Sequence, residues 1–201
     1  MIANSAQWMQ HLASPDVAHV HTVVLVLLLI VAAAIDVRTM RIPNWLTVTG
    51  AVMGLALSAA IPWQVLGPRW ALDGLLWALG GMAAGLLLPL PLYALRVMGA
   101  GDVKLIAMVG TFVGLQQIVP TVLCVFITGG VVALVWAMYR RALRRVAANV
   151  RDAVSSMAFS VISATPLTGM APGASLGKLP YGMSISVGTI LYLASHQLGF
   201  L

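Results

Sequence analysis

Acidic side chains are scarce in this sequence of 201 residues, which contains no glutamate and only five aspartates. Charged residues of both signs make up 8% of the chain, whereas a soluble domain carries about 25%. With 61% hydrophobic residues, the composition predicts an all-α polytopic integral membrane protein rather than a soluble domain. Because acids are so few, each one needs an explanation. They are Asp16, Asp36, Asp73, Asp102 and Asp152.

Cysteine is also nearly absent. The single residue, Cys124, lies in an apolar stretch, so neither an intrachain disulfide nor a CxxC zinc site can form. The net charge of +6 does not indicate nucleic-acid binding, because the basic residues lie between apolar stretches. Basic residues in such places orient a membrane protein, since cytoplasmic loops collect lysine and arginine.

Six apolar stretches approach the roughly 20 residues that cross a bilayer. They are 18–36, 44–61, 71–95, 103–119, 119–139 and 181–199, with Pro120 nearly joining the fourth to the fifth. If the N-terminus lies outside, ten of the 11 lysines and arginines fall inside, and only Arg69 falls outside. No positive charge precedes the first stretch, so we expect it to be retained rather than cleaved as a signal peptide. The prediction is a single membrane domain, residues 1–201, with six helices and both termini outside.

Small residues and prolines predict where helices pack and end. Gly81 and Gly85 in the third stretch have the spacing of a small-xxx-small packing face, as do Gly110 and Gly114 in the fourth. The prolines of "PLPLYAL" (89–95) should bend or end the third helix. We expect these glycines to serve helix packing.

The connection after the fifth stretch holds most of the remaining polar residues. Residues 152–180 predict a cytoplasmic or interfacial loop, because their longest apolar run is too short to span. The basic run 140–151 indicates attraction to anionic lipid rather than a dock for an acidic partner. Loop serines and Lys178 could form a Ser/Lys nucleophilic site, but nothing in the sequence brings them together. The topology puts four histidines outside, too far for an inner site: His11, His19, His21 and His196.

Two aspartates lie where a charge is costly. Asp36 ends the first apolar stretch and Asp102 begins the fourth, so the topology puts both at the same depth on the inner side. A charge at the centre of a membrane helix costs roughly 2.5–3.5 kcal/mol, and less near the interface. The two acids either form a functional pair or make ion pairs with neighbouring basic residues. Residues two apart on a helix do not face each other, which weakens pairing with Arg38 and with Lys104.

Two carboxylates at one site suit peptide hydrolysis. Adjacent aspartates cannot both ionise readily, so they share one proton and titrate as a unit. The ionised one activates water and the protonated one polarises the peptide carbonyl, without a metal or organic cofactor. We expect Asp36 to carry the shared proton more often, because a helix N-terminus favours the charged form of Asp102. Gly99 and Gly101 would let a substrate or the first helix approach closely, although a plain loop predicts the same glycines.

The motifs around these acids resemble a known family. The sequence "GAGD" (99–102) matches the GxGD signature of intramembrane aspartyl proteases, a group that includes presenilin-type enzymes. Three stretches together resemble the bacterial prepilin peptidase family: "DVRTMRIPNWLT" (36–47), "GDVKL" (101–105) and "KLPYGMSISVG" (178–188). The resemblance covers most of residues 20–195.

The resemblance implies six transmembrane helices and two catalytic aspartates, Asp36 and Asp102, at the cytoplasmic face of the bacterial inner membrane. Members of the family remove the basic leader from type IV prepilins, ahead of the pilin's hydrophobic helix. Many also methylate the new N-terminus and carry a zinc-binding cytoplasmic domain. Here the first cytoplasmic loop is only about Arg38–Pro43 and no CxxC exists, so the chain resembles the short, peptidase-only branch of Tad/Flp systems. The implied partners are a prepilin and the lipid bilayer, with self-association into a homo-oligomer left open and no nucleic acid.

Two other functions stay open as alternatives. A small proton-coupled transporter or channel would use the two aspartates as relay groups, but the central parts of the spans contain almost no polar side chains. An inactive structural subunit of a pilus assembly is the other alternative. Lys104 and Asn44 are candidates for supporting the site, with Asn44 expected to cap the second helix.

Overall fold

The computed structural model describes residues 15–94, 98–139 and 181–198, and within these ranges every regular element is a helix. Helices α2 (Pro15–Thr39), α3 (Asn44–Leu66) and α4 (Pro68–Leu87) follow one another along the chain. The short α5 (Leu90–Ala94), the long α6 (Ala100–Tyr139) and α8 (Tyr181–Gln197) come after them. The predicted all-α class is confirmed. The expectations for the basic run 140–151, the loop 152–180 and its serines lie outside the described residues.

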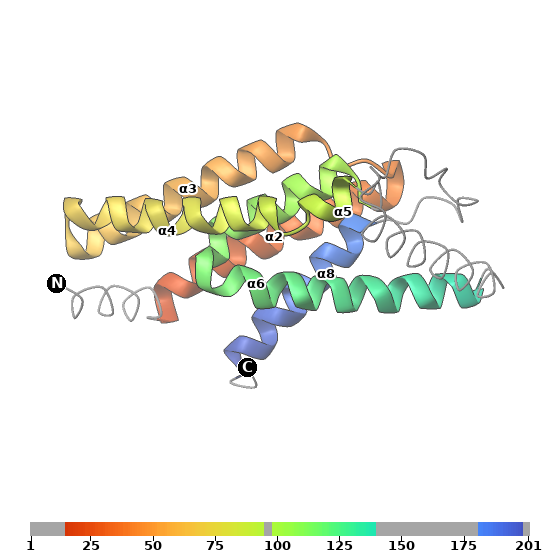
Figure 1. The fold of residues 1–201 in the computed structure, drawn as a ribbon. Coiled ribbons are helices and arrows are strands. Elements are labelled where there is room, and N and C mark those ends of the chain that lie inside the picture. The colour runs from red at the N-terminus through yellow and green to blue at the C-terminus, as the bar shows by residue number, and fades with distance from the viewer. Residues whose placement is uncertain (1–14, 95–97, 140–180, 199–201) are drawn as a thin grey trace, which may run out of the picture. The chain divides into compact units, whose positions relative to one another are not determined.

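The chain forms two compact units, one made of residues 1–129 with 180–201 and the other of residues 130–179. All described helices belong to the first unit except the last part of α6. In Figure 1, α3 and α4 lie side by side, and α2 packs against both α3 and α8. The first unit therefore brings together helices from the two ends of the sequence.

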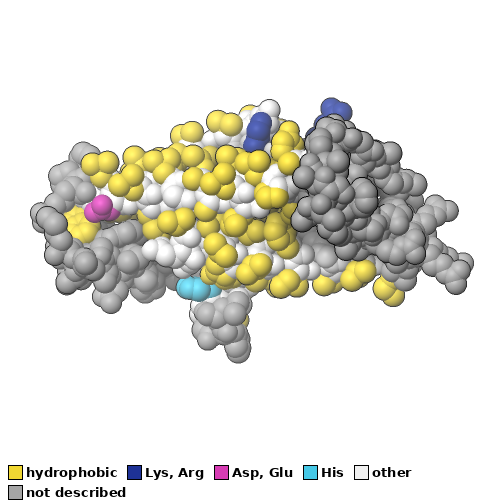
Figure 2. All heavy atoms as spheres, in the orientation of Figure 1, with side chains coloured by type: hydrophobic (Ala, Val, Ile, Leu, Met, Phe, Trp, Pro, Cys, Tyr) yellow, Lys and Arg dark blue, Asp and Glu magenta, His cyan; other side chains and the backbone are white. Residues whose placement is uncertain are grey.

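Four described stretches are long and apolar enough to cross a membrane: Val20–Thr39, Asn44–Pro62, Trp70–Ala94 and Ala100–Val135. Large apolar side chains such as Leu27, Leu76 and Ile127 are exposed along them. Figure 2 shows a face that is mostly hydrophobic, which is what a surface in contact with lipid requires. The chain is a multi-pass membrane protein, while six spans and external termini stay predictions.

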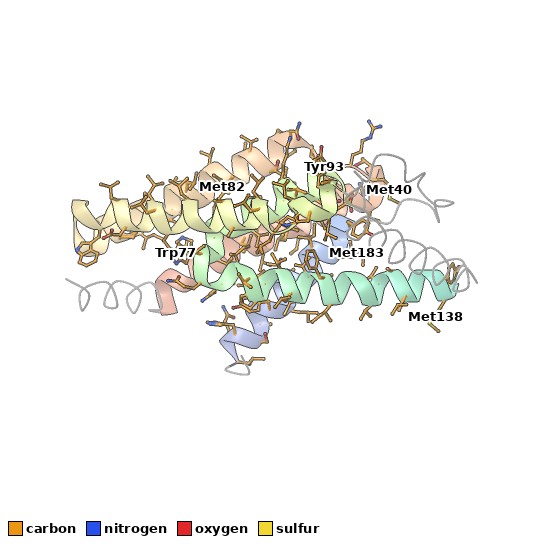
Figure 3. The ribbon with its side chains drawn as sticks, in the orientation of Figure 1. Met40, Trp77, Met82, Tyr93, Met138 and Met183 are labelled. Carbon is orange, nitrogen blue, oxygen red and sulfur yellow. The ribbon has the colours of Figure 1, made fainter. Side chains whose placement is uncertain are left out.

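The fourth and fifth predicted spans form one element, α6, which bends at Gly114 with φ of 72° and ψ of 178°. The predicted junction at Pro120 is wrong, because Pro120 lies inside the helix after the bend. A positive φ suits glycine, and the Trp77 indole fills the space that a Cβ would need. Figure 1 shows the α6 ribbon changing direction, and Figure 3 labels Trp77 beside the bend. Residues 100–113 rise only about 21 Å, which is less than the hydrocarbon thickness of about 30 Å.

The first segment of α6 is the centre of the core. Residues 105–114 are all buried, including the large side chains of Leu105, Met108 and Val109. A helix that is apolar on every side needs apolar surroundings, either lipid or other helices, and here other parts of the protein bury this segment. This segment is therefore held in place by its neighbours, and its N-terminal end carries Asp102.

The predicted glycine faces pack against each other. Gly81 of α4 meets the backbone of Gly110 and of Gly114, and Gly85 meets the backbone of Ile106. At these contacts a Cβ would collide with main-chain atoms of the facing helix. The prediction that these residues serve close helix packing is confirmed.

Two connections in the first half of the chain are short. The helix α4 ends at Leu87, two residues before Pro89, as the proline ring leads one to expect. The helix α2 ends at Thr39, and only residues 40–43 join it to α3. No domain is inserted between these two helices.

The first unit also buries polar side chains near the ends of its membrane-length helices. His21 Nε2 lies 3.3 Å from Ser58 Oγ, which in turn lies 3.3 Å from the Thr111 carbonyl oxygen. The imidazole also lies edge-on to Phe112, with ring centroids 6.3 Å apart. His21 lies in α2 and is buried, and its predicted place on the outer side of the membrane stays a prediction. Polar side chains between membrane helices commonly bond across the contact in this way.

Candidate active site

Asp36 lies in the last turns of α2 and points into the protein, with 4% of its surface exposed. The backbone N–H of Gly182, in the first turn of α8, donates to Asp36 Oδ2 at 2.8 Å. The N–H of Met183 also interacts with this carboxylate. The first N–H groups of a helix have no partner within the helix. Asp36 therefore caps α8 from a distant part of the chain.

Asp102 lies in the first turn of α6 and caps its own helix. Its Oδ2 accepts a hydrogen bond from the N–H of Gly99 at 3.1 Å. The Gly99 carbonyl in turn accepts from the N–H groups of Asp102, at 3.1 Å, and of Val103, at 3.3 Å. Gly99 is the N-cap and Asp102 is the third residue of the helix. An acidic side chain at that position commonly accepts a hydrogen bond from the backbone N–H of the N-cap residue. The GxGD sequence therefore has a local structural role besides any chemistry.

The structure brings the two aspartates near each other. The charge of Asp36 acts on Asp102, and the charge of Asp102 acts on the Tyr181 hydroxyl at the start of α8. Within residues 15–94, 98–139 and 181–198, neither carboxylate makes an ion pair, which leaves the ion-pair alternative without support there. In the same ranges no three His, Cys, Asp or Glu side chains gather as metal ligands. The arrangement is two carboxylates within electrostatic range of each other, one of them bonded to the start of α8.

Lys104 and Asn44, the two candidates for a supporting role, contact each other. Lys104 Nζ donates to Asn44 Oδ1 at 3.0 Å, and both side chains are exposed. Asn44 begins α3 and Lys104 lies near the start of α6, so the bond ties two helix ends together. The sequence favoured Asn44 as a cap of α3, but the contact that the structure gives this oxygen is to Lys104.

The glycines of the GxGD sequence allow close approach. A Cβ on Gly101 would lie 3.3 Å from Ile42 Cβ and 3.6 Å from the Ile42 carbonyl oxygen. A Cβ on Gly99 would lie 3.1 Å from Asp102 Oδ2. Gly101 thus lies against the connection between α2 and α3, and Gly99 leaves room for the carboxylate that it binds. Access for a substrate, the role expected from sequence, stays a prediction.

Sequence reasoning missed the part that α8 has in this site. A Cβ on Gly182 would lie 2.9 Å from Asp36 Oδ2 and 3.0 Å from both Cβ and Cγ of Asp36. The signal was the "PYG" sequence at 180–182, with a glycine directly inside the start of a helix. Its partner could not be identified, because Asp36 is 146 residues away in the chain.

Comparison with known families connects this geometry to an activity. The model of the type IV leader peptidase family matches residues 23–134, more than half of the chain. The match includes both aspartates and the GxGD sequence and ends before α8. Comparison with curated proteins gives no match, and neither does comparison with solved structures. The predicted family is confirmed: the chain belongs to the type IV leader peptidase family, whose members are prepilin peptidases that act on protein substrates in a lipid bilayer.

Proposed function

We propose that this membrane peptidase is an aspartyl endopeptidase that removes the leader from type IV prepilins of the Flp type. Asp36 and Asp102 supply the two catalytic carboxylates. The observation that carries the proposal is their arrangement. They come from the end of α2 and the start of α6 and lie within electrostatic range of each other, and Asp36 is bonded to the start of α8.

In the proposed reaction one carboxylate is ionised and the other is protonated, because two adjacent charges repel. The ionised group takes a proton from water, whose oxygen attacks the carbonyl carbon of the scissile peptide. The protonated group gives its proton to the carbonyl oxygen, and a tetrahedral diol forms. The C–N bond then breaks as the leaving nitrogen takes the proton that came from water. One diol hydroxyl returns a proton to the other carboxylate, which restores the starting pair.

The proposed site of cleavage is the cytoplasmic face of the bacterial inner membrane. Both carboxylates lie near helix ends, so the pilin's apolar helix can remain in lipid while its basic leader lies in the cytoplasm. Only residues 40–43 join α2 to α3, which leaves no room for a methyltransferase domain at this connection. The proposal is therefore for leader cleavage without N-methylation, by a chain with six spans and both termini in the periplasm.

Co-expression with a Flp-type prepilin, with leader loss read by mass, tests the proposal. We expect the unmodified protein to remove the leader, and Asp36→Asn and Asp102→Asn each to abolish its removal. Asparagine keeps an oxygen that can accept the same backbone N–H, so both variants should fold. Asp73→Asn is the matched control, because Asp73 is exposed on α4. Full cleavage by either site variant would exclude the dyad.

Proton-coupled transport is a second candidate, because polar groups are buried between the helices. His21 contacts Ser58 near the start of α2, and Ser186 contacts the Leu29 carbonyl at 2.9 Å about midway to Asp36. These groups are spread along α2 as a relay would require. Reconstitution into liposomes separates the two functions. Proton uptake without proteolysis would favour transport, and cleavage without uptake favours the peptidase.

A further inference from the structure

Within the part of the chain that the structure describes, helix α8 begins at Tyr181, and the Asp36 carboxylate binds its first N–H groups. Residues 178–180, directly before Tyr181, are Lys-Leu-Pro, and none has the short oxygen-bearing side chain that usually caps a helix. The N–H groups of Gly182 and Met183 instead interact with the Asp36 carboxylate. N–H groups at a helix N-terminus, together with the positive end of the helix dipole, hold a carboxylate well. The bond that caps α8 therefore also determines where Asp36 points.

A second contact fixes the position of α8 along α2. Ser186 Oγ lies 2.9 Å from the Leu29 carbonyl oxygen and 2.9 Å from the Gly182 carbonyl oxygen. Leu29 lies about two turns before Asp36 on α2, so the two contacts fall along one side of that helix. Gly182 is buried between them and directly touches the Asp36 side chain.

We propose that Gly182 is a positioning residue for Asp36, whose carboxylate it orients through its backbone N–H. This inference rests on the proposed function, because it assumes that Asp36 acts in catalysis. Gly182 acts through Asp36 and needs no contact with the substrate. Glycine is required because a Cβ would lie 2.9–3.0 Å from three atoms of Asp36 and push the carboxylate away. A displacement of about 1 Å at a reacting group can cost about 100-fold in rate.

The kinetics of Gly182→Ala test this role. We expect kcat per folded molecule to fall about 100-fold with KM unchanged, because substrate binding is kept while the carboxylate is misplaced. Gly188→Ala is the matched control on the same helix. A Cβ there would lie 2.6 Å from Val125 Cα, which disturbs the packing of α8 away from Asp36. Gly188→Ala should lose stability and keep its kcat per folded molecule. Unchanged kcat in Gly182→Ala, or an equal loss in both variants, would overturn the inference.

If Gly182→Ala does not fold, the bond between Gly182 and Asp36 can be tested by nuclear magnetic resonance, without any proteolysis assay. In protein with isotope-labelled glycine, the Gly182 amide proton should resonate downfield and exchange slowly, because it is bonded to a carboxylate. Asp36→Ala should move this signal and speed its exchange, whereas Asp73→Ala should leave it unchanged. An unmoved signal in Asp36→Ala overturns the inference. If the signal moves but the unmodified protein cleaves no prepilin, the bond stands, and the catalytic assignment falls together with the proposed function.

Discussion

Replacing Gly81 with alanine should lower the free energy of unfolding, whereas the same change at the neighbouring Gly80 should not. A Cβ on Gly81 would lie 2.7 Å from the Cα and 2.8 Å from the carbonyl carbon of Gly114, and would press on the Gly110 carbonyl oxygen. All of these are backbone atoms, so α4 and α6 would have to move apart. A Cβ on Gly80 would lie 3.5 Å from Leu115 Cβ, which is an ordinary contact.

Two terms set the expected size of the effect. Forcing an extra group into a well-packed interior costs typically about 1–3 kcal/mol. Alanine is favoured over glycine inside a helix by about 0.5–1 kcal/mol, and both variants gain this. The difference between the two variants therefore isolates the packing term, about 1–3 kcal/mol. That is roughly a 5- to 140-fold difference in the unfolding equilibrium constant.

Reversible unfolding in mixed detergent micelles, followed by the loss of helical circular dichroism, measures this difference. Gly80→Ala should match or exceed the unmodified protein in free energy of unfolding, and Gly81→Ala should fall below both. Prepilin cleavage should fall with Gly81→Ala as well, because α6 carries Asp102 at its start. Equal stability of the two variants would refute the direct backbone contact between α4 and α6.

Two further predictions concern polar contacts inside the first unit. Trp77→Phe should lower the free energy of unfolding by about 1 kcal/mol, because it removes the 2.8 Å bond to Gln116 and keeps a ring over Gly114. Ser58→Ala should cost about 1–3 kcal/mol, because its hydroxyl contacts the buried His21. Thermal unfolding of each variant beside the unmodified protein measures both effects. An unchanged midpoint would contradict the contact concerned.

The helices could be predicted from apolar length, but the bend in α6 could not. Pro120 marks an obvious break in sequence, yet it lies within a helix, because neighbouring groups can satisfy the carbonyl that proline leaves free. Gly114 was assigned to packing from its spacing alone. Gly114 has a positive φ and lies against the Trp77 ring, and that contact between α4 and α6 is not visible in local sequence.

The sequence led to both aspartates, because scarce acids at matching depths stand out in an apolar chain. The sequence did not predict the hydrogen bonds that orient the two carboxylates. Asp102 is fixed by a local cap on Gly99 that the GxGD spacing could have indicated. Asp36 is fixed by Gly182, through a tertiary contact that only the packing of α2 on α8 creates. Lys104 and Asn44 were chosen separately, and their mutual bond depends on the same assembly of helix ends.

Chemical cross-linking between positions 36 and 102 tests most directly whether the two carboxylates share one site. The protein would carry Cys124→Ser, together with Asp36→Cys and Asp102→Cys, and would be treated with a short bifunctional thiol reagent. The account predicts one intramolecular bridge per folded molecule, measured by mass. Asp36→Cys with Asp73→Cys is the control pair and should take up two separate reagents. Gly74, next to Asp73, packs against the Ser58 carbonyl, and Ser58 contacts His21 near the start of α2, whereas Asp36 lies near the end of that helix. A folded protein in which positions 36 and 102 react separately would contradict the account.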